Sequence, residues 1–104
     1  MPAETITTTD FGRLIASGAL AGPENQHLEL IYGELRRMSP LGTEHAEVVA
    51  RFTEHSFQAV KTDSVAIRVQ SPIEISELDT QPQPDVVWVH RRSYARRHPR
   101  PADV

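Results

Sequence analysis

The sequence predicts a mixed α+β fold in which strands pack on one long helix. A chain of 104 residues, with 38% hydrophobic and 24% charged residues, has room for one modest core. Apolar residues recur at helical spacing in two segments and alternate with polar residues in others. A proline-rich approach ends directly before residues 86–89, which are apolar and rich in valine, and this favours a buried strand. We therefore expect a short helix, a β-hairpin, a long helix and then two or more strands.

The N-terminal third predicts the short helix and the hairpin. Residues 1–9 are polar and rich in threonine, and we expect them to be disordered. Thr9 or Asp10 can cap the short helix through a side-chain oxygen. From residue 27 to residue 38 the chain alternates on both sides of Gly33, which can take the positive φ of a tight turn.

The long helix follows a threonine. Thr43 is a suitable cap, and the spacing of the apolar residues after it predicts a helix that runs to about Lys61. These residues predict a broad buried face, made of Val48, Val49, Phe52, Phe57, Ala59 and Val60.

The remaining chain predicts strands and a basic tail. Residues 65–69 alternate as a half-buried strand, and residues 73–75 continue the alternation. The strand 86–89 follows a loop. The tail, residues 90–104, reads as a loop with some helical content around residues 93–97.

Composition excludes several classes of protein. The absence of cysteine excludes disulfides and thiolate metal sites and fits a reducing compartment. No apolar run approaches the roughly 20 residues of a membrane span, and no signal peptide is present, so we expect a cytoplasmic protein without a membrane partner. The five histidines lack the spacing of a zinc site.

Asp85 lies at the junction between the prolines and the apolar strand. A carboxylate held at the rim of a buried strand is partly buried and fixed in geometry, which suits a metal ligand. The alternative is that Asp85 ends the loop by accepting hydrogen bonds from nearby backbone N–H groups. Local sequence leaves both interpretations open.

Several motifs occur in an order that resembles the Uma-two family of restriction-endonuclease-like proteins. The resemblance covers nearly the whole chain and also includes His45 at the start of the long helix. Its motifs are LELIYGEL at 28–35, MSP at 38–40, VQSPI at 69–73, QPDV at 83–86 and HPRPADV at 98–104.

The resemblance implies a nuclease core of the PD-(D/E)xK type, in which two carboxylates hold Mg²⁺ and a lysine assists, with DNA as the substrate and partner. Asp85 matches the Pro-Asp acid and is the candidate metal ligand and catalytic residue. Glu34 matches a turn glutamate and is a candidate second catalytic acid; the alternative is a solvated hairpin residue. His45 and Gln70 are candidates for contacting the substrate or supporting the metal ligand. The alternative for His45 is that it is simply a polar residue near the start of the helix. The alternative for Gln70 is that its side chain simply points outward from a strand.

The arginines of residues 91–100 also leave alternatives open. They could bind DNA phosphates, or they could form a solvated basic loop or a patch that lacks its acidic partner.

The chain departs from the family pattern in two places. Tyr32 replaces the usual Asp or Asn, and the family's Glu-Val-x-Ser strand and later lysine would follow Val104. We therefore expect residues 1–104 to be a single incomplete nuclease-like domain that does not cleave DNA. The alternative functions are a non-catalytic binding or assembly module, forming a homodimer or pairing with a complementary chain, and an unrelated α+β domain.

Overall fold

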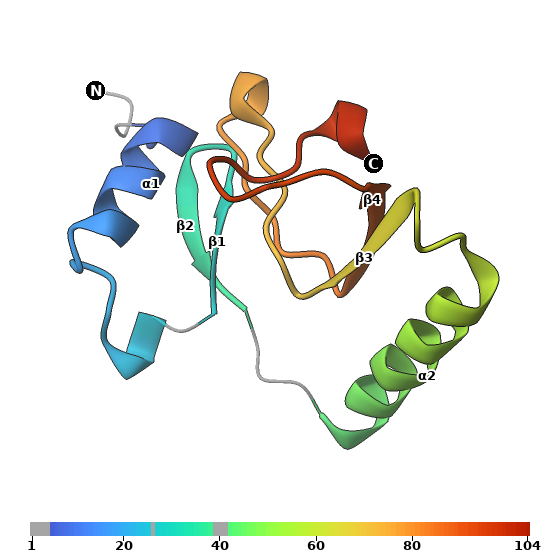
Figure 1. Cartoon of the computed structure of the whole chain (residues 1–104). Helices are drawn as coiled ribbons and strands as arrows, with labels where there is room; N and C mark the ends of the chain where they lie inside the picture. Colours follow the sequence, from blue (N-terminus) through green and yellow to red (C-terminus); the bar gives the residue numbers. More distant parts are fainter. Residues whose placement is uncertain (1–4, 26, 39–41) are drawn as a thin grey trace. The chain divides into compact units, whose positions relative to one another are not determined.

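The structure is a computed structural model that describes residues 5–25, 27–38 and 42–104 (Figure 1). The predicted disordered segment 1–9 and the MSP motif at 38–40 therefore lie partly outside the described residues.

Contacts divide the chain into two compact units. Unit 1 comprises Met1–Pro40 and Glu74–Pro82, and unit 2 comprises Leu41–Ile73 and Gln83–Val104. Helices and small antiparallel sheets occur in the predicted order, so the α+β class is confirmed. That the two units form one domain stays a prediction.

Unit 1 begins with helix α1, Thr8–Ala16. Its cap is Thr7, so the prediction of Thr9 or Asp10 as the cap is wrong. Thr7 Oγ1 accepts from the N–H of Asp10, at 3.1 Å, and an Asp10 carboxylate oxygen accepts from the N–H of Thr7, at 3.3 Å. This reciprocal capping box satisfies two N–H groups at the helix start, which a cap at Thr9 would not do.

The predicted hairpin is confirmed as β1, Leu28–Ile31, paired antiparallel with β2, Glu34–Arg37. Tyr32 and Gly33 form its turn with φ values of 47° and 79°. Both angles are left-handed, as a two-residue turn between twisted strands requires. A side chain on Gly33 would also place its Cβ 2.1 Å from the methyl carbon of Thr5, so glycine is needed here for space as well as for φ.

The core of unit 1 lies where the hairpin meets the segment before Pro82. Leu30 is fully buried and exchanges two backbone hydrogen bonds with Gln81. The Thr80 hydroxyl accepts from the N–H of Tyr32 at 3.0 Å. Buried polar residues are therefore paired with the hairpin backbone, which removes the cost of burying them.

Helix α2, Thr43–Ala59, begins unit 2's secondary structure. The cap is Gly42 rather than the predicted Thr43, and the helix ends two residues before the predicted Lys61. The predicted broad buried face is also wrong, because Ser56 is the buried residue of this helix. The apolar side chains that remain exposed include Val48 at 62%, Phe52 at 50% and Phe57 at 55%.

Strands β3, Val65–Val69, and β4, Val86–His90, form an antiparallel pair. Val87 and Val89 are buried, as predicted for a buried strand, but Trp88 between them is 40% exposed, so β4 is not buried along its whole length. The predicted strand at residues 73–75 is wrong, because among the described residues only an isolated bridge from Ile75 to Thr80 forms there.

Gln70 gives the physical reason why β3 does not continue. Its φ is +49°, a left-handed conformation that turns the chain out of the sheet directly after Val69. Pro72 lacks the N–H that a continued ladder would need.

The tail contains a short 3₁₀ helix, Pro101–Asp103, and no helix at residues 93–97, so the predicted helical content is misplaced. Asp103 causes this arrangement, because its carboxylate accepts from the N–H of Arg100 at 2.9 Å and from the Arg97 guanidinium at 2.8 Å.

One hydrogen bond connects α2 to β4. The indole Nε1–H of Trp88 donates to Ser56 Oγ at 2.9 Å, and the Ser56 hydroxyl donates to the carbonyl of Phe52 at 2.7 Å. Ser56 is fully buried, so its small side chain lets the helix approach the strand while still offering the indole an acceptor.

We expect Trp88→Phe to lower the free energy of unfolding by about 1 kcal/mol, because it removes this hydrogen bond and keeps an aromatic ring. Ser56→Ala removes the same bond from the other side. In urea denaturation, the double variant should therefore lose less free energy of unfolding than the two single variants lose together. Fully additive effects would mean that the two side chains do not interact.

Candidate active site

Asp85 is the central residue of the candidate site and directly precedes β4 in unit 2. Pro84 fixes the approach, and the buried valines of β4 anchor the strand behind it. The side chain of Asp85 is 42% exposed. The carboxylate is therefore held at the rim of a buried strand, where solvent and ions still reach it.

His45, in the first turn of α2, is the hydrogen-bond partner of that carboxylate. His45 Nε2 lies 2.8 Å from Asp85 Oδ2, although the two residues are forty positions apart in the chain. An ionised carboxylate can only accept hydrogen bonds, so with Asp85 ionised the N–H of His45 Nε2 is the donor. Within the described part of the chain, the carboxylate of Asp85 has no hydrogen bond from a backbone N–H. The remaining oxygen, Oδ1, therefore has lone pairs for another ligand.

Gln70 meets Asp85 through the backbone. Its N–H donates to the carbonyl of Asp85 at 3.0 Å, one step beyond the last ladder pair, Val69 with Val86. The left-handed φ of Gln70 is a strained conformation for a residue with a side chain, and such strain is often found at functional sites. The structure thus brings three of the four candidate residues together: Asp85, His45 and Gln70.

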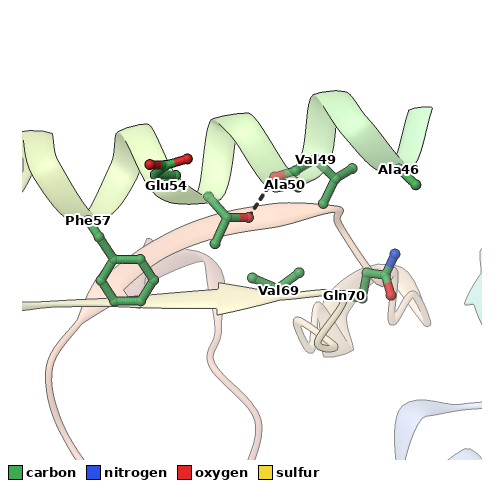
Figure 2. A pocket seen from close by; sticks show the side chains of 8 residues that line it. Ala46, Val49, Ala50, Glu54, Phe57, Val69 and Gln70 are labelled. Carbon is green, nitrogen blue, oxygen red and sulfur yellow. Dashed lines mark hydrogen bonds between the residues drawn. The ribbon is translucent and has the colours of Figure 1, made fainter. Parts of the chain in front are cut away.

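An open groove lies between α2 and the end of β3 (Figure 2). Its volume is about 500 Å³, and its walls are mostly apolar. Ala46 and Val49 line it on the helix side, and Val69 and Gln70 line it on the strand side. Ala46 follows His45 in sequence and Gln70 bonds to Asp85, so the groove begins beside the carboxylate–imidazole pair.

A comparison with family models gives one match over residues 10–104, to the family described as "Uma2: Putative restriction endonuclease". The chain belongs to the Uma2 family. No curated protein and no solved structure matches it. Membership supports a nuclease-like function. That Pro84-Asp85 is the Pro-Asp of the family pattern stays a prediction.

Glu34 lies in unit 1, at the start of β2. Its side chain is 69% exposed and pairs with the Arg36 guanidinium at 3.3 Å. Such a pair between exposed side chains contributes little to stability, so the carboxylate stays available to other ligands. That Glu34 serves the same site as Asp85 stays a prediction.

The ligands at this site fit a metal ion only in part. Mg²⁺ prefers oxygen ligands and keeps several waters, so a half-exposed carboxylate such as Asp85 fits as one ligand. In the described ranges, no group of three or more histidine, aspartate or glutamate side chains is placed to hold a metal ion. Asp85 can therefore supply one ligand, with His45 orienting it from the opposite oxygen.

The described helices include none that is long and apolar enough to cross a membrane.

Two features that sequence reasoning missed shape unit 2 around the site. The first is the bond from Trp88 to Ser56, for which the mostly polar neighbours of Ser56 give no sequence signal. The second is Asp103, the one acid that follows the run of arginines. Its spacing of three from Arg100 is that of a capping residue.

Asp103 is the most perturbed acid of unit 2. The hydrogen bond from Arg97, followed by the one from the Arg100 N–H, lowers the pKa of its carboxyl from 3.8 to about 2. Burial, followed by the negative charge of Asp103, raises the pKa of the Tyr94 hydroxyl, which donates to the carbonyl of His90. The C-terminal turn is therefore organised by one carboxylate.

We expect the stability contributed by Asp103 to be lost at acid pH. The folded pKa is lower than the unfolded one, so the contribution is complete above about pH 4 and disappears as the pH falls towards about 2. Urea midpoints measured across this range should fall more steeply for the wild type than for Asp103→Asn. Asp63→Asn, an exposed change in the turn before β3, should keep the wild-type slope. Equal slopes for the wild type and Asp103→Asn would contradict the assignment.

Proposed function

We propose that the Uma2 chain carries a metal-binding aspartate of a Mg²⁺-dependent site that hydrolyses DNA phosphodiester bonds. The observation that carries this proposal is the environment of Asp85. Its carboxylate is half exposed at the start of a buried strand, and it is held by a histidine instead of by the neighbouring backbone. Family membership supports the nuclease chemistry, and the Pro-Asp match supports the choice of residue.

In this proposal the Asp85 carboxylate would hold the ion, while His45 contacts its Oδ2. A bound Mg²⁺ supplies positive charge for the phosphate and makes a coordinated water more acidic. The residues of the chain provide position: His45 limits rotation of the carboxylate, and the bond from Gln70 fixes the backbone of Asp85. Glu34 is proposed as a second acid on the strength of the family pattern.

We also propose that residues 1–104 alone do not cleave DNA. Phosphodiester hydrolysis by this type of site needs an ordered ion between two carboxylates. Among the described residues, Asp85 has a histidine rather than a second acid beside it. A single carboxylate binds Mg²⁺ too weakly to keep the ion ordered.

Asp85→Asn tests the metal ligand. Mn²⁺ can replace Mg²⁺ and broadens the NMR signals of nearby nuclei, so titration of the 104-residue chain should broaden the amides of residues 45, 70 and 85 first. The substitution keeps the shape of the side chain and removes its charge, and the selective broadening should disappear. Asp63→Asn, at an exposed acid of the same unit, should keep it.

Two outcomes would contradict these proposals. Broadening that is unchanged in Asp85→Asn would exclude Asp85 as the ligand. Metal-dependent nicking of a plasmid by the purified 104-residue chain, abolished by Asp85→Ala, would show that the single carboxylate suffices.

His45 substitutions test the role of the imidazole. His45→Ala should weaken the binding of Mn²⁺ at Asp85 by about tenfold, as is typical when a partner of a metal ligand is removed. His45→Gln can still donate an N–H to Oδ2 and should recover part of this affinity. His55→Ala changes another histidine of the same helix and should have no effect. Equal affinity in all variants would mean that His45 does not position Asp85.

A second candidate function is a non-catalytic assembly module. The observation in its favour is the apolar surface that Val48 and Phe52 form one turn apart on α2, where each is at least half exposed. Surfaces of this kind are found at protein–protein contacts. A monomer at high concentration, measured by sedimentation velocity, would count against this candidate and leave the nuclease proposal unaffected.

A further inference from the structure

We propose that the loop after β4, residues 91–100, binds the DNA phosphate backbone independently of sequence, with Arg92 and Arg96 as its contacts. This inference rests on the proposed function, because that function names DNA as the substrate. It adds the surface on which the DNA lies. Figure 1 draws this loop in red between β4 and the C-terminal turn.

The loop carries charge of one sign. Residues 91–100 contain five arginines and no acid, and the nearest acids in the sequence are Asp85 before it and Asp103 after it. Asp103 places one negative charge beside the guanidinium groups of Arg92 and Arg97, so the loop's five arginines outnumber the one acid that contacts them in these ion pairs. Guanidinium groups held close together repel one another, and an anion with several charges relieves this repulsion when it binds. A phosphate backbone is such an anion.

The arginines divide into those that build the loop and those that face solvent. The Arg91 guanidinium donates to the carbonyls of Thr62 and Val65, which fastens the loop to the start of β3. Arg97 donates to Asp103. These arginines are used by the fold, and we do not assign them to DNA.

Arg92 and Arg96 remain for binding. The Arg92 side chain is 55% exposed and lies 3.7 Å from Asp103, which is a weak contact that a phosphate can replace. Arg96 is exposed and has no hydrogen-bond or charge partner within the part of the chain that the structure describes. Guanidinium groups donate two parallel N–H bonds to phosphate oxygens, so arginine suits this role.

The loop is ordered before DNA arrives. Tyr94 donates to the carbonyl of His90 at 2.6 Å, and Asp103 holds Arg97 and the backbone of Arg100. A surface that is already fixed loses less conformational entropy on binding than a flexible tail does. The positive charge is therefore presented by a fixed loop.

Tyr94 indicates that binding is independent of base sequence. Its ring lies 5.3 Å from the Arg68 guanidinium carbon and 5.8 Å from that of Arg97. Two cations already lie near this ring, and they compete with a base for stacking on it. Contacts to phosphates are what the remaining arginines can make.

The distance along β4 fits a duplex that reaches both Asp85 and the loop. The strand has five residues, which is about 17 Å at the usual rise per residue. Along a DNA axis this corresponds to about five base pairs. A duplex lying along β4 would then have one phosphate near the carboxylate and another near the start of the loop that carries the arginines.

The test is DNA binding by the 104-residue chain in EDTA, measured by fluorescence anisotropy with a labelled duplex at several salt concentrations. We expect Arg96→Gln to weaken binding several-fold and to reduce the slope of log affinity against log salt by about one, and Arg92→Gln/Arg96→Gln to reduce it further. Arg13→Gln removes an arginine of α1 that is also exposed and should have no such effect. Thermal melts should show the same stability for these surface variants.

The outcomes separate this inference from the proposed function. Binding that is unchanged in Arg92→Gln/Arg96→Gln, or weakened equally by Arg13→Gln, would overturn the loop assignment while Mn²⁺ binding at Asp85 stands. Equal affinity for a polyglutamate peptide would overturn DNA as the partner of the loop. Loop-dependent DNA binding together with no Mn²⁺ binding at Asp85 would support the loop and contradict the metal site.

Discussion

The geometry of the candidate site depends on one hydrogen bond, the 2.8 Å contact between His45 and Asp85. It joins the first turn of α2 to the start of β4, and the bond from Trp88 to Ser56 joins the same two elements further along. Two contacts at separate points fix both the position of the helix on the strand and its rotation. Because Asp85 directly precedes β4, the strand then presents its carboxylate to the helix without any loop residue in between.

Local chemistry explains which parts of the fold could be predicted. The hairpin is specified by alternation and by Gly33, whose positive φ is a property of the residue itself. The prediction of a broad buried face on α2 was wrong because burial depends on what covers the helix. Strands β3 and β4 contact only part of it. The strand expected at residues 73–75 failed because Gln70 adopts a left-handed φ, for which its side chain gives no sequence signal.

The site could be predicted in its parts but not in its arrangement. Proline before an apolar strand indicated where Asp85 lies, and the family motifs indicated His45 and Gln70. Their meeting depends on how α2 packs on β4, which is a tertiary property across forty residues. Ser56 was missed for the same reason, because a serine in an amphipathic helix usually faces solvent, whereas here the indole of Trp88 gives it a partner.

Charge places an additional requirement on such a site. Asp85 and a DNA phosphodiester are both negative, so without a cation between them the carboxylate repels the substrate that it is proposed to act on. In the proposed function, attraction then comes from another part of unit 2. Arg92 and Arg96 belong to the loop that follows β4, whereas Asp85 directly precedes this strand. In the proposed function, separating the attractive charge from the metal ligand would let DNA bind while Asp85 keeps an oxygen available for the ion.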